Sequence, residues 1–273
     1  MKGTLKMDLK QFIAQKDEKP LDNLVTDGGL CGIFRTIACV GDSLSSGEFE
    51  SLDDEGKKDY HDMYEYSWGQ YIAREAGCKV YNFSRGGMSA QWYCDSFADE
   101  KDFWNEDKKC QCYIFALGVN DLHETDSIEM GSVKDIDVND WRNNKKTFAG
   151  YYAQIIQRLK ENQPHAKFFL MTIPKSEDSE GLKKIRDNHA KLLYDMAELF
   201  DYTYVLDLRK YAPEYDAEFK HNFYLGGHMN PAGYMLTAKM VMSYIDYLIR
   251  HNPEDFAQVG FIGTGHHNVS AKW

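Results

Sequence analysis

Short apolar runs alternate with amphipathic stretches along most of the chain. Five runs rich in β-branched and aromatic residues have the length of strands, and they lie at residues 35–41, 79–84, 112–118, 167–173 and 202–208. The third run is apolar throughout, as expected of a strand that is covered on both faces. Because stretches with helical spacing separate the runs, the pattern predicts an α/β fold in which helices cover both faces of a five-stranded parallel sheet.

Helix boundary signals support this pattern. Ser67 is a suitable N-cap for a helix that Gly77 ends. Asn230 caps the last long helix, and Pro231 takes its first position, where the missing N–H costs little. Two further helices are predicted from apolar residues at helical spacing, the first from Phe148, Tyr151, Tyr152, Ile155, Ile156 and Leu159 and the second from Ile185, His189, Leu192, Leu193 and Met196.

The 273 residues contain no repeat, low-complexity segment or linker, so we expect one domain. Residues 1–34 precede the first strand and form an N-terminal extension that we expect to wrap the outside. Residues 251–273 are rich in Gly, His and Asn and form a C-terminal tail. The composition of this tail fits either a segment packed back on the domain or one used at an interface.

The overall charge narrows the choice of partners. The formal net charge is -11, and such a surface repels nucleic acid and anionic lipid. A small-molecule substrate is the expected partner, and assembly into a homo-oligomer stays open. The chain has no stretch of about 18 apolar residues that would span a membrane, and no apolar core follows the first lysines as in a signal peptide. The six cysteines show no paired metal-binding spacing, which favours reduced thiols and a cytoplasmic location.

Polar motifs follow four of the predicted elements. Gly41-Asp42-Ser43 ends the first strand, Asn82-Phe83-Ser84-Arg85-Gly86-Gly87 the second and Gly118-Val119-Asn120-Asp121 the third, while Gly227-His228-Met229-Asn230 follows the fifth after a loop. Ligands of open α/β sheets bind beyond the carboxyl ends of the strands. Each motif alone is weak evidence, but their coincidence at one edge of one sheet predicts a functional site there.

In this order the four segments resemble the conserved blocks of the SGNH (GDSL-like) hydrolases. Ser43 matches the nucleophile of the family, Gly87 and Asn120 match its oxyanion-hole residues, and His228 matches its histidine base. The resemblance implies the family's flavodoxin-like three-layer α/β/α fold and acyl-ester chemistry without a metal or organic cofactor. It also implies that the N–H groups of Ser43 and Gly87 and the side-chain amide of Asn120 stabilise the oxyanion. A serine hydroxyl needs such a base within hydrogen-bond reach, and its tetrahedral intermediate needs such donors.

One position departs from the family pattern. The family usually has an Asp three residues before the histidine, where this chain has Leu225. Either a backbone carbonyl holds His228, leaving a Ser-His dyad, or a carboxylate from elsewhere replaces the missing Asp; Asp216 and Glu218 are the nearest candidates in sequence. The departure also motivates an alternative function, a catalytically impaired binding protein that kept the fold.

The sequence therefore predicts a carboxylic ester hydrolase, with a small acyl group such as acetyl on a carbohydrate or similar alcohol. Six aromatic residues near the motifs fit either a sugar-stacking wall or ordinary packing: Tyr60, Tyr64, Tyr66, Trp92, Tyr93 and Trp104. We interpret His266-His267 as part of a solvated tail rather than a metal site. We interpret the acidic run at residues 53–55 as a solvated loop, because the spacing of a calcium loop is absent. A nucleotide binder is disfavoured because the chain lacks a phosphate-cradling glycine loop.

Overall fold

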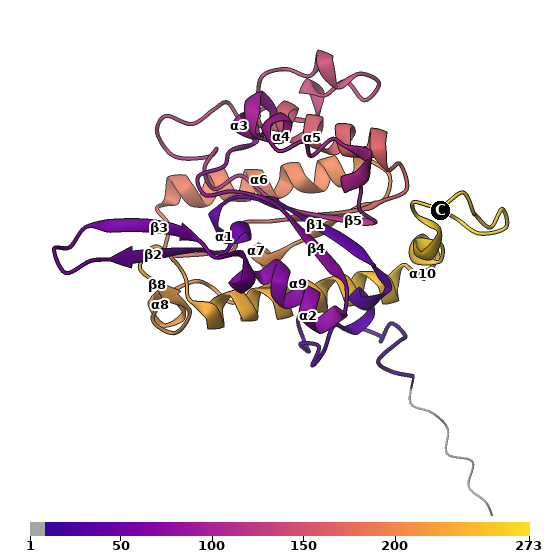
Figure 1. Ribbon diagram of the computed structural model, residues 1–273, viewed down its shortest axis with the longest axis horizontal. Coiled ribbons are helices and arrows are strands. Elements are labelled where there is room, and N and C mark those ends of the chain that lie inside the picture. The colour runs from indigo at the N-terminus through magenta and orange to yellow at the C-terminus, as the bar shows by residue number, and fades with distance from the viewer. Residues whose placement is uncertain (1–8) are drawn as a thin grey trace, which may run out of the picture.

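The computed structural model describes residues 9–273. At its centre is a parallel sheet with the strand order β4-β1-β5-β6-β7 (Figure 1). All neighbouring strands of this sheet run parallel. The strands coincide with the five predicted runs, so the predicted fold is confirmed. They are β1 (Thr36–Gly41), β4 (Lys79–Ser84), β5 (Cys112–Ala116), β6 (Lys167–Met171) and β7 (Thr203–Leu206).

Helices cover both faces of the sheet. In Figure 1, α5 and α6 lie above the strands, and α2 and α9 lie below them. The helices are α1 (Ser43–Ser46), α2 (Trp68–Ala76), α3 (Ala90–Trp92), α4 (Ala98–Glu100), α5 (Phe148–Asn162), α6 (Glu180–Leu199), α7 (Leu208–Tyr211), α8 (Ala217–Phe223), α9 (Pro231–His251) and α10 (Pro253–Phe256). Shorter 3-10 turns and one π-helical turn at Tyr93–Phe97 occupy parts of the connections.

The alternation of side chains along each strand divides the core into two halves. Successive strand residues point to opposite faces. In β1, Ala38 and Val40 join the apolar cluster that contains α5 and α6, whereas Ile37 and Cys39 join the cluster that contains α2 and α9. Because both faces of β1 are buried, its sequence is apolar at every position from Ile37 to Val40.

The predicted helix caps are present. Ser67 accepts a hydrogen bond from the N–H of Gln70 at the start of α2, and Gly77 follows its end. Asn230 accepts one from the N–H of Gly233, with Pro231 at the first position of α9. Within residues 9–273, no helix is long and apolar enough to cross a membrane. All six cysteines, which lie in this range, are free thiols.

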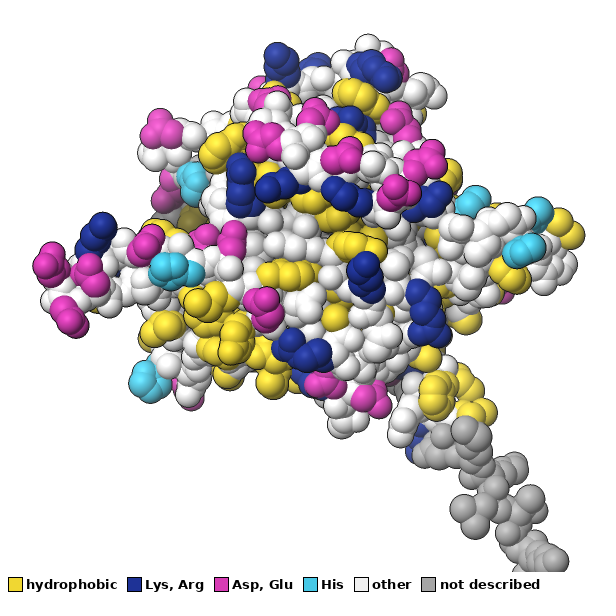
Figure 2. Space-filling view, viewed as in Figure 1, with side chains coloured by type: hydrophobic (Ala, Val, Ile, Leu, Met, Phe, Trp, Pro, Cys, Tyr) yellow, Lys and Arg dark blue, Asp and Glu magenta, His cyan; other side chains and the backbone are white. Residues whose placement is uncertain are grey.

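Two short antiparallel ribbons were not predicted. The first is a hairpin of β2 (Glu48–Leu52) and β3 (Lys58–Asp62), which projects from the domain next to α1 (Figure 1). The acidic run at residues 53–55 is the exposed turn of this hairpin, and Figure 2 shows acidic side chains gathered at its tip. The second ribbon joins β8 (Tyr224–Leu225) to β9 (His228–Met229). These ribbons position the site described below.

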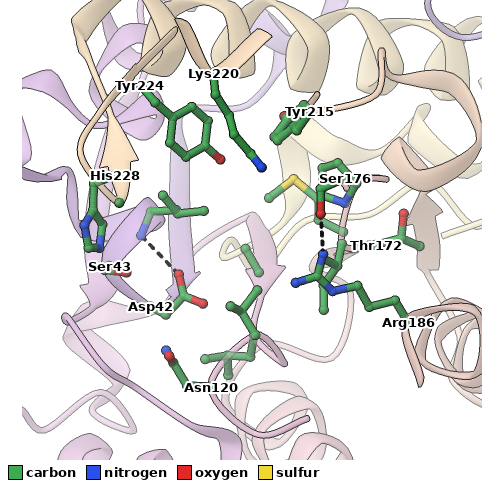
Figure 3. Close-up of a pocket in the computed structure, with 18 residues that line it drawn as sticks. Asp42, Ser43, Asn120, Thr172, Ser176, Arg186, Tyr215, Lys220, Tyr224 and His228 are labelled. Atoms are coloured by element: carbon green, nitrogen blue, oxygen red, sulfur yellow. Dashed lines mark hydrogen bonds between the residues drawn. The ribbon is translucent and has the colours of Figure 1, made fainter. Parts of the chain in front are cut away.

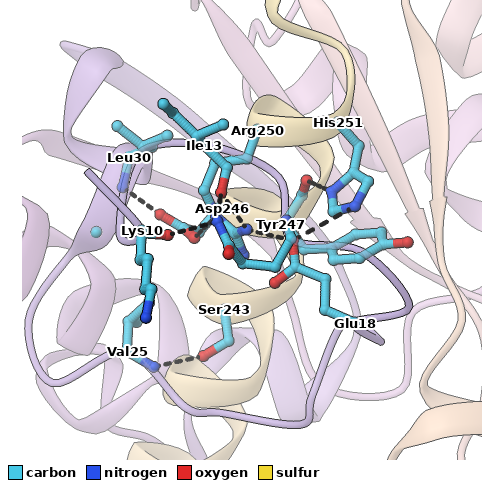
Figure 4. Close-up of polar contacts among 12 residues, drawn as sticks. Lys10, Ile13, Glu18, Val25, Leu30, Ser243, Asp246, Tyr247, Arg250 and His251 are labelled. Carbon is cyan, nitrogen blue, oxygen red and sulfur yellow. Dashed lines mark hydrogen bonds and ion pairs between the residues drawn. The ribbon is translucent and has the colours of Figure 1, made fainter. Parts of the chain in front are cut away.

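The segment before β1 lies against α9. The N–H of Val25 donates to Ser243, and Arg250 lies between the carboxylates of Glu18 and Asp246 (Figure 4). The expected extension also includes residues 1–8, which lie outside the described residues. At the other end, the side chains of Phe256, Val259 and Ile262 are buried in the core, and the Trp273 ring stacks on His165, so the tail packs back on the domain.

Candidate active site

The chain turns sharply from β1 into α1. Gly41 ends the strand, and a Cβ atom there would overlap Oγ of Ser45, so the turn requires glycine. The Asp42 side chain accepts a hydrogen bond from the N–H of Leu44 at 3.1 Å and caps α1. Ser43 is therefore fixed at the first position of this helix, at the carboxyl edge of the sheet.

A cavity of about 310 Å³ opens at this edge, where the strand order reverses between β1 and β5. Three of the four predicted site residues line it: Ser43 from α1, Asn120 after β5 and His228 from β9 (Figure 3). The rest of the lining comes largely from the loop after β6 and from residues 215–227. Residues from five separate parts of the sequence thus meet at one site.

Gly87, the fourth predicted residue, lies in the loop after β4 and does not itself line the cavity. Its φ of +70° is a left-handed conformation that favours glycine, and it is exposed, with open space where a side chain would stand. The side-chain amide of Asn120 donates to the carbonyl of the next residue, Met88, at 3.1 Å. Asn82 accepts from the N–H of Ser84 at 2.9 Å, which ties down the start of this loop.

A carboxylate does contact the histidine, although Leu225 replaces the usual Asp. Oε1 of Glu48, on β2, lies 3.1 Å from Nε2 of His228, and both side chains are largely buried. The other ring nitrogen, Nδ1, is buried and has no hydrogen-bond partner among the described residues. Burial lowers the pKa of the His228 imidazole, an effect that the charges of Glu50 and Asp62 oppose. Burial and the charge of Asp62 raise the pKa of Glu48.

The β2–β3 hairpin holds this pair from several sides. Glu50 accepts from the N–H of Gly227 at 3.0 Å and pairs with Lys58 at 2.7 Å. The Tyr60 ring meets the His228 ring edge to face, with the centroids 5.7 Å apart. On the far side of Glu48, a Cβ atom on Gly86 would overlap the carboxylate, so this glycine leaves room for it.

The two carboxylates proposed from the sequence as partners of His228 have other positions. Asp216 caps α8 by accepting from the N–H of Phe219 at 2.8 Å. Glu218 lies exposed in the first turn of the same helix. Leu225 is 54% exposed and pairs with His228 across the β8–β9 ribbon. The partner comes instead from a hairpin close to the nucleophile, which proximity to His228 in sequence did not indicate.

Two buried acids support the loops of the site. Burial raises the pKa of Asp42 to about 7, and it raises that of Asp121 to about 7. Asp121 accepts from the N–H of Ala90 at 2.8 Å and so connects the loop after β5 to the loop after β4. These acids hold the backbone around Ser43 and Asn120 in place.

Three further polar residues line the cavity, and no sequence motif indicated them. They are Arg186 on α6, Lys220 on α8 and Tyr224 on β8. Of the six aromatic residues noted from the sequence, none lines the cavity and Tyr60 alone contacts His228, while Tyr93 is fully buried in the core. In residues 9–273 no group of three possible ligands is arranged to hold a metal ion.

Comparison with known proteins agrees with this geometry. Residues 39–236 match the model of the GDSL-like Lipase/Acylhydrolase family. No curated protein sequence matches the chain.

Solved structures share the fold. A family two carbohydrate esterase from Clostridium thermocellum, in complex with cellohexaose, superposes with a TM-score of 0.57 at 16% identity, covering 79% of this chain and 64% of that one. A possible lipase from Chitinophaga pinensis gives 0.51 at 16% identity, over 79% and 99% of the two chains. An acetyl xylan esterase gives 0.50 at 18% identity, over 77% and 99%. The chain spans less than two thirds of the Clostridium esterase, so the likeness concerns the catalytic fold. The family match covers most of the chain: the protein belongs to the GDSL-like lipase/acylhydrolase family and is a carboxylic ester hydrolase.

Proposed function

We propose that the protein cleaves short-chain acyl esters, such as acetyl esters of a carbohydrate or similar alcohol, through an acyl-enzyme on Ser43. The observation that carries this proposal is the 3.1 Å contact of Glu48 with His228, a residue that lines the same cavity as Ser43 and Asn120. A serine becomes a nucleophile when a base takes its proton, and that base needs a third group to orient it. Glu48 is the orienting group in this proposal.

The Glu48 contact determines which nitrogen of His228 is basic. A neutral imidazole has one N–H and one lone pair. If Nε2–H donates to Glu48, the lone pair lies on Nδ1, which makes no competing hydrogen bond with the described residues. Nδ1 accepts the Ser43 proton as Oγ bonds to the acyl carbon, and returns it to the oxygen of the departing alcohol. Water then attacks the acyl carbon and gives a proton to Nδ1 of His228. The bond from the acyl carbon to Oγ breaks, the carboxylic acid leaves, and the proton returns from Nδ1 to Oγ of Ser43.

The oxyanion formed in each step needs donors that are already in place. The N–H groups of Ser43 and Gly87 and the side-chain amide of Asn120 take this role. Asn120 uses one hydrogen to bond Met88 at 3.1 Å, which orients the amide and leaves its second hydrogen for substrate.

Two features support a short acyl group. The cavity volume of about 310 Å³ is at the low end for small-molecule sites. The carbohydrate and acetyl xylan esterases named above share the fold, which makes acetylated carbohydrates the first substrates to try. The alternative of an impaired binding protein was motivated by Leu225, and Glu48 removes that motive by supplying a carboxylate.

The test is hydrolysis of p-nitrophenyl acetate, butyrate and octanoate by the wild type and by Ser43→Ala. We expect the wild type to prefer the shorter esters and Ser43→Ala to fall to background. Equal activity of the two proteins would show that Ser43 is not the nucleophile. Inactivity of both on all three esters and on acetylated xylan would favour the binding protein.

A further inference from the structure

The cavity has a second, basic end. Figure 3 shows the Lys220 ammonium group and the Tyr224 hydroxyl pointing into the cavity from one side, and the Arg186 guanidinium entering from the other. Apolar side chains also line the cavity, including Leu44, Met171 and Ile173. The same cavity thus contains the nucleophile, two cations and an apolar part of the lining.

The charge of the lining contrasts with that of the whole protein. The chain has a formal net charge of -11, yet Arg186 and Lys220 are cations in the lining and Asp42 is its one carboxylic acid within residues 9–273. Burial raises the pKa of Asp42 to about 7, so this acid is only partly ionised at neutral pH. The lining of the cavity therefore carries more cations than acids, although each cation also pairs with a carboxylate outside the lining, and cations in a cavity attract anions.

Each cation keeps the capacity to bind a ligand. Lys220 is paired with Glu177 at 3.5 Å, but both side chains are about half exposed, and such surface pairs contribute little. Arg186 is held more firmly, because Nη1 donates to Asp178 at 2.7 Å and to Ser176 at 2.8 Å. Its Nε and Nη2 make no hydrogen bond with the described residues. Asp178 thus holds the guanidinium in place, and the nitrogen atoms Nε and Nη2 are left to donate to a ligand.

We propose that this end of the cavity binds a carboxylate carried by the substrate, so that the enzyme prefers anionic esters over neutral ones. Arg186 and Lys220 supply charge-assisted hydrogen bonds, and the Tyr224 hydroxyl supplies a neutral donor. This inference rests on the proposed function, since it concerns the same cavity. The carboxylate belongs either to the acyl group or to the alcohol, and the experiment separates the two.

Matched pairs of esters test the acyl side. The monoethyl esters of succinate, glutarate and adipate are compared with ethyl butyrate, valerate and hexanoate, which have the same number of acyl carbons and no charge. For the alcohol side, para-acetoxybenzoate is compared with its methyl ester. We expect kcat/KM to be at least about tenfold higher for the anionic member of one set, as one charge-assisted hydrogen bond provides.

Substitutions then assign the preference to the cations. Lys220→Met should reduce the ratio of anionic to neutral kcat/KM about tenfold. Arg186→Met is combined with Asp178→Asn, because removal of the cation alone would leave a buried carboxylate unpaired. The matched control is Lys191→Met, a cation on the exposed side of α6 whose loss should leave the ratio unchanged.

Each outcome has a distinct meaning. A preference in the acyl set or the alcohol set that Lys220→Met removes supports the inference and identifies the side that carries the carboxylate. If the wild type hydrolyses p-nitrophenyl acetate in a Ser43-dependent way but shows no anionic preference in either set, the inference is wrong and the proposed function stands. A preference that survives both sets of substitutions also overturns the inference. Absence of any Ser43-dependent hydrolysis, including of the anionic esters, refutes the proposed function itself.

Discussion

Nε2 of His228 lies 3.1 Å from Oε1 of Glu48, so the hairpin that follows the nucleophile supplies a carboxylate to the histidine loop. The two residues are far apart in sequence and belong to different ribbons, β9 and β2. The contact puts a carboxylate beside the imidazole even though Leu225 occupies the position where the family usually has its acid. In our proposal Glu48 is a positioning residue that acts through His228.

Removal of this carboxylate should impair the chemical step. We expect Glu48→Gln to reduce kcat by about 10²–10⁴ with little change in KM, because the wrong imidazole tautomer is then favoured. Steady-state kinetics on p-nitrophenyl acetate measures kcat and KM separately. Glu55→Gln, in the exposed turn of the same hairpin, is the control and should have wild-type kinetics. A kcat for Glu48→Gln within twofold of wild type would mean that a backbone group holds the imidazole instead.

A methyl group on Gly86 should displace Glu48 without unfolding the protein. A Cβ atom there would overlap Oε2 of Glu48, the end of a flexible side chain that can move away. We therefore expect Gly86→Ala to lose activity in the same direction as Glu48→Gln while its melting temperature changes little. Gly260→Ala, where a Cβ would meet open space, is the control. Full activity in Gly86→Ala would show that the position of Glu48 does not matter for catalysis.

The enzyme should stay active at mildly acidic pH. Only the neutral imidazole can accept the serine proton, and burial lowers the pKa of His228 from its ordinary value of 6.5. The acidic limb of kcat/KM on a neutral ester should therefore lie below pH 6.5. Glu50→Gln removes a negative charge that raises this pKa, so it should move the limb to still lower pH. A limb at or above the ordinary histidine value, or one that Glu50→Gln moves upward, would contradict the assignment of His228 as the base.

The buried His189 should make stability depend on pH. Burial lowers its pKa from 6.5 to about 4, and its ring lies beneath Gly118 and against Phe148. Its contribution to stability is complete above pH 6.5 and is lost as the pH falls towards 4, because the unfolded chain takes up the proton first. Asp42 and Asp121 act in the opposite direction between about pH 4 and 7, since their folded pKa values are raised.

A difference measurement isolates this histidine. The free energy of unfolding from urea titrations is compared for wild type and His189→Gln at several pH values. The destabilisation caused by the substitution should shrink between pH 6.5 and 4 by up to about 3 kcal/mol, which is the linkage expected for such a shift. A destabilisation that stays constant over this interval would show that His189 titrates with an ordinary pKa in the fold.

The parts of the structure that follow from local pattern could be predicted from the sequence. The strands are apolar because both of their faces are buried, and the caps at Ser67 and Asn230 act over a single helical turn. Ser43, Asn120 and His228 meet because strand order alone determines which loops share an edge of the sheet. Three of the four predicted site residues could therefore be placed at the cavity from the order of the strands and the type of motif after each.

The β2–β3 hairpin could not be predicted in the same way. Most of its side chains are partly or fully exposed, so its sequence lacks the alternation of apolar and polar residues that marks a half-buried strand. The contact of Glu48 with His228 and the convergence of Arg186 and Lys220 both depend on how separate loops fold over the sheet. Contacts between residues of separate loops leave no pattern in the local sequence from which they could be predicted.

The place of Glu48 on the hairpin also affects how relatives should be classified. In our proposal the acid lies five residues after the nucleophile, and the position of Leu225 then needs no acid. Enzymes with the same acid on a hairpin would depart from the family pattern at that position and still have a carboxylate beside the histidine. A survey that scores only that position would class such enzymes as degenerate, and one that scores the hairpin would retain them.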